Sequence, residues 1–311
     1  MYPLRYEHHS IFDEFLARRD SIAMAETGTA NLEFGTCSWN YDSWIGLVYD
    51  KKAEYSAAYL SQYAKRYRTV EVDSWFYAVP DPSDAADYAS RVPPDFSFAC
   101  KLTESISLTH ERNRDKTAPL VVNPDFLSVE RYAHFVSNIE ALLPRIFLLE
   151  LEFEYLNKQK MADLSAFLKA IEVFVTRLDT VGLRDAIPLA IECRNANYLK
   201  REYFQFLKDH GVAHVFSEKL YLPHIYELYA QFGDLIGDRV AIRLLGGDRK
   251  EIESKTKGNW NEIVEPKADL PEVASMIGDL AKGSRIVKVY LNNHFEGSAP
   301  KSIGRLEALL L

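Results

Sequence analysis

Charged residues stand two positions apart in stretches of this sequence that otherwise read as buried β-strands. Glu71 and Asp73 occur in TVEVDSW, and Glu192 and Arg194 occur in AIECR. Side chains two apart on a strand point to the same face, so each pair projects together. Carboxyl groups can donate and accept protons in catalysis, and arginine binds carboxylates and phosphates. The pattern therefore predicts general acid–base chemistry on a small anionic or polyhydroxylated molecule.

Other β-rich stretches carry polar residues in the same way, namely Lys101, Glu150, Glu152, Arg243, Tyr290, Asn292 and His294. A parallel barrel strand is covered on both faces and should be almost wholly apolar. Because the adjacent positions are mostly apolar, we expect the polar set to point into a barrel near the C-terminal ends of its strands. An isolated buried charge is costly, so these groups must pair, bind an ion or face a wet cleft. A structural network in which they neutralise one another is the alternative. Barrel enzymes keep their sites at the strand C-terminal ends, which favours a cleft.

The sequence therefore predicts a set of site residues with distinct roles. The predicted catalytic groups are Glu192, Glu71, Asp73 and the loop residue His110, for which a solvated loop histidine without a chemical role is the alternative. The predicted substrate-binding residues are Lys101, Arg194, Arg243, Tyr290, Asn292, Trp39 and Tyr77. Because three cations would converge on one cleft, we expect phosphate, sulfate or a carboxylate to bind at Arg194 or Arg243. For Trp39 and Tyr77, packing at the top of the barrel is the alternative to substrate stacking.

Two further functions compete with a cofactor-free enzyme. The oxygen and nitrogen ligands Glu71, Asp73, Glu150, Glu192 and His294 would suit Mg²⁺, Mn²⁺ or Zn²⁺ in a metal-dependent hydrolase or isomerase. No H-E-x-x-H motif supports a metal, and the three nearby cations oppose one. The loop run HERNRDK would suit a non-catalytic protein that binds an anionic ligand or a nucleic-acid end.

The elements that must position these residues alternate regularly along the chain. The β-rich stretches are Leu32–Trp39, Thr69–Tyr77, Phe96–Leu102, Ile146–Phe153, Pro188–Arg194, Val212–Ser217, Arg239–Gly246 and Arg285–His294. Amphipathic helical patterns lie between them. No G-x-G-x-x-G follows the first strand, which argues against a doubly wound open sheet. We predict a single (β/α)8 TIM-type barrel over residues 32–311, with an N-terminal arm over residues 1–31. The long connections 103–127 and 247–268 would lie over the C-terminal face as lids or binding loops.

Composition narrows the class of protein and its surroundings. The formal net charge of −8 argues against nonspecific binding to nucleic acid. No stretch has the length and apolarity of a signal peptide or membrane span, so we expect no membrane partner. Three widely separated cysteines do not make a disulfide framework, which fits a reducing cytoplasm. By strand parity, Cys100 and Cys193 face the helices and Cys37 faces the barrel interior, so we expect separate thiols and no metal cluster.

Five segments of the chain resemble the successive motifs of the YecE-like family, domain of unknown function 72. They are FGTCSWNYDSWIGLVY, TVEVDSWFYAVP, FSFACKLTESISLTH, AIECRNANYL and VYLNNHFEGSAP, and the resemblance runs from about residue 33 to residue 308. It implies a TIM-type barrel without an established activity. It also implies site positions at Trp39, Glu71, Asp73, Ser74, Phe76, Tyr77, Lys101, His110, Glu192, Arg194, Arg243, Tyr290, Asn292, Asn293 and Gly297.

The chain departs from the pattern of that family at four places. The family usually has asparagine at position 73, where this chain has Asp73. A Gln-Leu-Pro-Pro motif is expected where Glu150–Phe153 stands, and His-Pro where Asn195-Ala196 stands. A histidine is expected at Leu245. These departures imply a member with a divergent substrate or weakened activity.

Overall fold

Eight parallel strands form the centre of the molecule, each hydrogen-bonded to its neighbours in the order β1-β8-β7-β6-β5-β4-β3-β2. The computed structural model describes residues 31–113, 115, 117–184 and 187–311. The strands are β1 (Leu32–Thr36), β2 (Thr69–Val72), β3 (Ser97–Lys101), β4 (Ile146–Phe153), β5 (Leu189–Cys193), β6 (Ala213–Lys219), β7 (Arg239–Gly246) and β8 (Ile286–Leu291). The predicted (β/α)8 barrel is confirmed. Of the predicted N-terminal arm, all but Asn31 lies outside the described residues.

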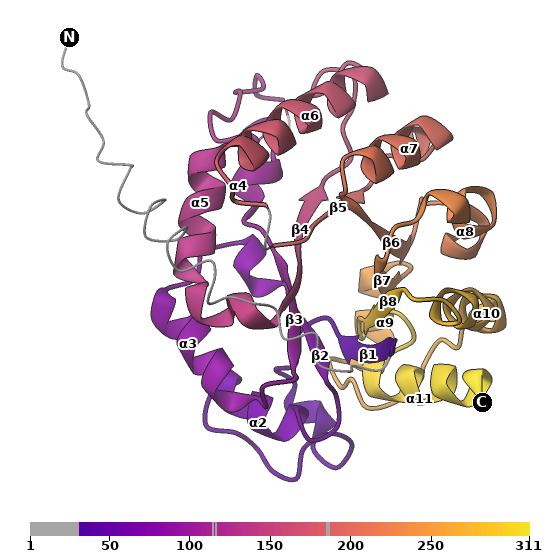
Figure 1. Cartoon of the computed structure of the whole chain (residues 1–311). Coiled ribbons are helices and arrows are strands. Elements are labelled where there is room, and N and C mark those ends of the chain that lie inside the picture. Colours follow the sequence, from indigo (N-terminus) through magenta and orange to yellow (C-terminus); the bar gives the residue numbers. More distant parts are fainter. Residues whose placement is uncertain (1–30, 114, 116, 185–186) are drawn as a thin grey trace.

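Helices surround the ring of strands on its outer side (Figure 1). The α-helices of the described residues are α2 (Leu60–Tyr63), α3 (Pro82–Arg91), α4 (Glu104–Ser107), α5 (Val129–Asn138), α6 (Leu164–Thr180), α7 (Arg201–Asp209), α8 (Ile225–Phe232), α9 (Arg249–Thr256), α10 (Leu270–Ala281) and α11 (Ala299–Leu310). Local signals set their starts: Asp163 caps α6 by accepting from the backbone of Ala166, and Asp81 and Asp84 form a capping box at α3. The helices α4 and α9 lie in the two long connections.

The barrel closes between β1 and β2 through a single bridge, from Cys37 to Glu71. The Tyr63 hydroxyl from α2 completes this seam. It accepts a hydrogen bond from the Thr36 backbone N–H at 2.9 Å and donates one to the Thr69 carbonyl at 3.1 Å. A Cβ atom on Gly35 would lie 2.2 Å from that carbonyl oxygen, so only glycine fits there. The seam thus consists of a side-chain hydroxyl and a close backbone approach rather than a full ladder.

Strand β2 is shorter than the sequence predicts, and this difference shapes the site. The strand ends at Val72, and Asp73 turns into a helical conformation with φ −95° and ψ −12°. A short 3₁₀ turn, Ser74–Phe76, follows. Asp73 therefore stands on the turn that leaves the barrel, not on the strand.

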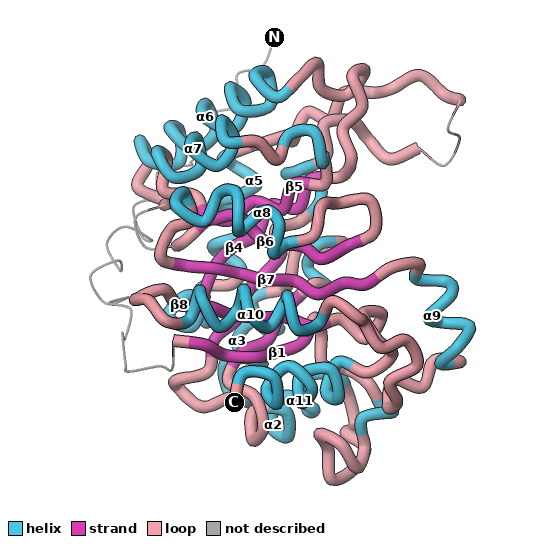
Figure 2. The backbone as a smooth tube through the Cα atoms, turned by 90° about the vertical axis from the view of Figure 1, so that its right-hand side faces the viewer, coloured by secondary structure: helices cyan, strands magenta, loops and turns pink. Residues whose placement is uncertain are grey.

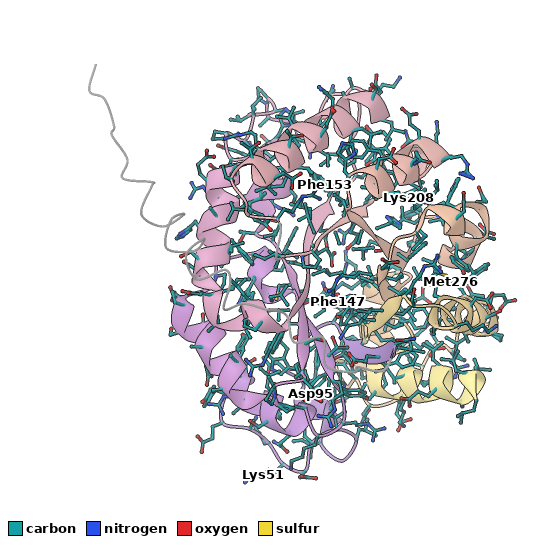
Figure 3. All side chains as sticks on the ribbon, in the orientation of Figure 1. Lys51, Asp95, Phe147, Phe153, Lys208 and Met276 are labelled. Atoms are coloured by element: carbon teal, nitrogen blue, oxygen red, sulfur yellow. The ribbon has the colours of Figure 1, made fainter. Side chains whose placement is uncertain are left out.

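Two groups of apolar side chains form the core, one outside the ring of strands and one inside it. Phe153 belongs to the larger group, between strands and helices, and Phe147 to the smaller one inside the ring (Figure 3). Cys100 and Cys193 belong to the outer group and Cys37 to the inner one, and all three are free thiols. The parity prediction for the cysteines is confirmed.

The C-terminal ends of the strands carry the long connections. Figure 2 shows α9, which follows β7, projecting beyond these strand ends. This end of the barrel is therefore the one over which loops can fold. Within the described part of the chain, no helix has the length and apolarity needed to cross a membrane.

Candidate functional site

Seven charged side chains meet inside the barrel near the C-terminal ends of five strands. We call them the charged floor: Glu71 on β2, Lys101 on β3, Glu150 and Glu152 on β4, Glu192 on β5, Arg194 directly after the end of β5, and Arg243 on β7. All but Arg194 are buried. The residues alternate with apolar neighbours, which face the helices, so strand periodicity alone sends them to one place.

Arg243 is the centre of the charged floor. Its Nε donates to Glu71 Oε2 at 2.7 Å and its Nη2 to Glu71 Oε1 at 2.8 Å, a bidentate pair. Its Nη1 donates to Glu192 and lies 3.5 Å from Glu152 Oε2 and 3.7 Å from Glu150 Oε1. One guanidinium thus contacts carboxyl groups from β2, β4 and β5. Its side chain is only 2% exposed, which leaves it closed to a ligand.

The other two cations of the floor differ in their exposure. Lys101 Nζ donates to Glu152 Oε2 at 2.8 Å and lies over the ring of Phe76. Arg194 lies 2.8 Å from Glu152 Oε2 through Nη2 and donates through Nε to Glu192 Oε1 at 3.1 Å. A quarter of the Arg194 side chain is exposed, against 8% for Lys101. Arg194 is the cation of the floor that a ligand can reach.

The charges of the floor determine which of its acids are ionised. Burial raises the pKa of Glu192, but Arg243 and then Arg194 outweigh it and hold that pKa well below its usual value. Burial also raises the pKa of Glu71, but the positive charge of Arg243 outweighs this effect and leaves that pKa below its usual value. For Glu150, burial wins and raises the pKa well above its usual value.

Two charged side chains beside the floor, Asp73 and Lys219, form no ion pair with any residue that the structure describes. Burial raises the pKa of the partly exposed Asp73 carboxyl, and the negative charge of Glu71 raises it further. Lys219 ends β6 and lines a cavity of about 300 Å³ with Tyr221 and Gly247. Burial lowers the pKa of Lys219, and the nearby Arg194 lowers it further. The two groups offer opposite charges next to the floor.

A histidine and an amide lie where β8 ends. The side-chain oxygen Oδ1 of Asn292 accepts from the His294 backbone N–H at 3.0 Å and lies 2.6 Å from the ring Nδ1 of His294. His294 Nε2 lies 3.1 Å from Glu253 on α9, and the ring packs on Trp260. Burial lowers the pKa of His294. The contacts of His294 with Glu253 and Trp260 join the long connection after β7 to the end of β8. The Asn292 side-chain oxygen, which was expected to bind substrate, is used by His294.

Tyr290 and Trp39, both predicted to bind substrate, are buried by packing. Tyr290 is 1% exposed in the inner core, where its hydroxyl lies 2.9 Å from Thr69 Oγ1. Trp39 is 3% exposed, and its indole N–H donates to the Ser56 carbonyl at 3.0 Å. These contacts favour the packing alternative for Trp39.

Tyr77 lies at an exposed position and His110 at a half-buried one, both outside the contacts of the charged floor. Tyr77 is 74% exposed and packs edge-on against Phe76. His110 bridges to Val122 and lines a separate cavity of about 1140 Å³, formed by residues 110–113, 115, 117–121, 154, 157, 159 and 160. The structure therefore brings together Glu71, Lys101, Glu192, Arg194 and Arg243, with Asp73 beside them, and does not join His110 to them.

Three of the acids expected to bind a metal, Glu71, Glu150 and Glu192, already lie against the Arg243 guanidinium. Oxygen atoms of Glu150, Glu152 and Glu192 lie within 4.8 Å of one another, close enough for one ion. Arg243 Nη1, however, lies against all three. A guanidinium thus takes the position that a metal would need, and Glu71 is held by the same arginine.

A second group with suitable atoms is Glu218, His224 and Asp269, on the wall of the cavity beside Lys219. There His224 Nδ1 lies 2.9 Å from the Glu218 carboxylate and 3.4 Å from that of Asp269. The imidazole therefore already has carboxylate partners, and an ion-pair cluster explains this group as well as a metal site does.

Sequence reasoning missed Lys219 and gave Glu152 no role as a site residue. The expected sixth strand ended at Ser217, whereas β6 continues to Lys219. Extending the same two-residue period from Val215 through Ser217 would have found the lysine. Glu152 binds both Lys101 and Arg194, and its register partner on β5 is Glu192.

Comparisons with known proteins agree with this architecture. A model of the family described as "Protein of unknown function DUF72" matches residues 33–311. A solved DUF72 family protein from Enterococcus faecalis superposes with a TM-score of 0.64 at 17% identity, covering 90% of this chain and 95% of that one. Another, from Thermotoga maritima, gives a TM-score of 0.60 at 19% identity, covering 90% and 98%. At such identities the likeness shows the fold alone. No curated protein matches the chain.

Proposed function

The chain belongs to the DUF72 family of proteins of unknown function, and we propose that it is an enzyme performing acid–base chemistry on a small anionic or polyhydroxylated molecule. The reaction site is the C-terminal end of the barrel, above the charged floor. One observation carries the proposal: Asp73 and Lys219 have no ion-pair partner among the described residues, beside a floor whose cations are all paired. Charges left open beside a self-paired network are available to a ligand.

Substrate binding falls to Arg194 and Lys219 in this proposal. Arg194 is partly exposed and held in place by two carboxylates, so its position is set before the ligand arrives. Lys219 lines the adjoining cavity. Of the two arginines at which the sequence predicts anion binding, this proposal assigns the contact to Arg194, because the Arg243 guanidinium is enclosed and holds Glu71 and Glu192.

Proton transfer falls to Asp73. Burial and then the negative charge of Glu71 raise the pKa of Asp73, and a raised pKa improves a carboxyl group as a general acid or base. Glu71 and Glu192 stay ionised and bound to Arg243, so they position the floor instead of exchanging protons with substrate. The asparagine that usually stands at position 73 in the resembled family cannot exchange a proton, which makes Asp73→Asn a matched test.

The binding step can be tested with inorganic sulfate and calorimetry. Wild-type protein binds sulfate, and Arg194→Ala weakens the affinity at least about tenfold, since a hydrogen bond to a charged group contributes roughly 1.5–3 kcal/mol. Arg249→Ala, at an exposed ion pair on α9, leaves the affinity unchanged. Absence of sulfate binding, or equal affinity in Arg194→Ala, would reduce Arg194 to a structural partner of Glu152.

The chemical step needs a screen of phosphate esters, glycosides and isomerase substrates, each with and without a chelator. We expect turnover that resists chelation and falls at least about hundredfold in Asp73→Asn, the usual scale of a general acid–base group. Turnover lost on chelation would favour the metal-dependent alternative. Anion binding without turnover of any class would favour the non-catalytic one.

A further inference from the structure

The charged floor contains one more acid than it contains cations. Its acids are Glu71, Glu150, Glu152 and Glu192, and its cations are Lys101, Arg194 and Arg243. Every one of these carboxyl groups is at most 5% exposed. A buried charge without a partner is costly enough that the group takes up a proton instead. The charge balance therefore calls for one proton on the floor.

Contacts within the floor indicate which acid holds this proton. Glu71, Glu152 and Glu192 each accept a hydrogen bond from a cation. Glu150 accepts none: its Oε1 has no hydrogen-bond partner among the described residues and lies 3.7 Å from Arg243 Nη1. Oxygen atoms of the Glu150 and Glu192 carboxyl groups lie within 4.8 Å of each other, and two buried carboxyl groups at such a separation do not both stay ionised without enough cations. Glu192 accepts hydrogen bonds from two guanidinium groups, so the proton belongs to Glu150.

We propose that Glu150 is a neutral carboxylic acid that shares its proton with Glu192, and that loss of this proton weakens anion binding at Arg194 and Lys219. The effect on anion binding rests on the proposed function, whereas the proton on Glu150 does not. Glu150 is a positioning residue, since it is buried below the site and acts through Glu192 on Arg194. When its proton passes to water, the floor changes from neutral to a net charge of −1, which offsets the positive charge of Lys219.

Other titrating groups around Glu150 must be separated from it. Lys101 faces it from β3, Glu192 from β5 and Arg243 from β7, and Glu71 on β2 acts on it through its charge. Ser217 on β6, the register partner of Arg243, adds a hydroxyl without a partner among the described residues. Burial raises the pKa of Glu150, which Arg243 opposes most strongly. Higher up, ionisation of Asp73 or neutralisation of Lys219 would also make the site more negative as pH rises.

The first experiment measures sulfate affinity against pH, because sulfate does not titrate above acidic pH. We expect the wild-type affinity to fall at least about tenfold as Glu150 ionises, the scale of one nearby unit charge at an effective dielectric constant of about 20. Glu150→Gln, which cannot ionise, should show no such fall. Asp73→Asn and Lys219→Arg, whose new side chains do not titrate, should retain it. A fall in Glu150→Gln as large as that of the wild type, or loss of the fall in either of the other variants, would overturn the proposal.

The second experiment follows unfolding and needs no ligand. Because the pKa of Glu150 is raised on folding, its stabilising effect is complete below the unfolded value of 4.5 and declines as pH rises toward the folded value. In that window the unfolding equilibrium constant of the wild type should grow up to about tenfold per pH unit relative to Glu150→Gln. A ratio that does not change with pH would show that Glu150 holds no proton in the folded protein.

The two experiments separate the possible failures. If sulfate never binds but the unfolding ratio changes with pH, the proposed anion site is wrong and the Glu150 proton stands. If Glu150→Gln does not fold, infrared spectroscopy of the wild type decides. A carboxylic-acid C=O band that persists after the surface carboxyl groups have ionised supports the proton, and its absence refutes it.

Discussion

At the scale of single residues, the site depends on an arginine enclosed in the barrel. Arg243 binds Glu71 through two parallel hydrogen bonds and Glu192 through a third. A guanidinium suits this position because its planar fork offers five donors in fixed directions, whereas a lysine ammonium could not span both acids with the same geometry. The fork thus favours the ionised form of both carboxylates and holds their pKa values below the usual range.

Removing Arg243 should therefore destabilise the protein strongly. Arg243→Ala leaves Glu71 and Glu192 without their main partner, and breaking a buried pair from one side costs about 3–5 kcal/mol. Urea denaturation followed by circular dichroism would measure the change in the free energy of unfolding. Arg249→Ala, from a solvent-exposed pair, is the control and should have little effect. Equal effects of the two substitutions would mean that the floor contributes little to stability.

At the scale of secondary structure, the seam between β1 and β2 is the unusual element. The other neighbouring strands are joined by ladders, but this pair has one bridge between Cys37 and Glu71. The Tyr63 hydroxyl supplies what the ladder lacks by serving the Thr36 N–H and the Thr69 carbonyl. Because Glu71 stands at this seam, the closure of the barrel and the position of the floor depend on the same contacts.

The hydroxyl of Tyr63 should consequently matter more than its ring. Tyr63→Phe leaves a buried backbone donor without a partner and removes a hydrogen bond from the Thr69 carbonyl, at a cost of about 1–3 kcal/mol. The matched control is Tyr132→Phe, since the buried Tyr132 hydroxyl has no hydrogen-bond partner among the described residues and its loss should be neutral or stabilising. Thermal unfolding of the two variants provides the comparison. A larger loss in Tyr132→Phe would contradict the role of the seam.

At the scale of the whole molecule, the ring of strands separates two groups of buried apolar side chains. Cys37 lies in the inner one, whereas Cys100 and Cys193 lie between strands and helices. Burial raises the pKa of all three thiols, that of Cys193 to about 12. The thiolate is the reactive form of cysteine. Burial therefore protects each cysteine from reagents in two ways, because it blocks their access to the sulfur and keeps the thiol protonated.

Thiol labelling can therefore report whether the two groups of buried side chains open together. In three variants that each keep one cysteine, with serine at the other two positions, we expect equal labelling rates that match the rate of global unfolding. Labelling during unfolding in denaturant, compared with tryptophan fluorescence, measures both rates. Faster labelling of Cys100 or Cys193 than of Cys37 would show that helices detach while the ring of strands stays closed.

Much of this architecture could be read from the sequence, because its signals are local. The two-residue period of a strand sends Glu71, Lys101, Glu192 and Arg243 to the interior face wherever the strand finally lies. The alternation of strands and helices implies a barrel, and a parallel barrel places all strand C-terminal ends together. The free thiols followed from the same parity.

Only the tertiary structure decided which charges pair and which stay open. Arg243 and Glu71 are 172 residues apart in the sequence, and their bidentate contact depends on distances across the closed barrel. Burial likewise depends on loops that cross from other units, so the sequence could not rank Arg194 above Arg243 as a ligand contact. The turn at Asp73 and the extra length of β6 at Lys219 arise from packing at the barrel rim, where strand periodicity no longer controls direction. The inward direction of a side chain is a property of its own strand, but its partners and its exposure are properties of the assembled barrel.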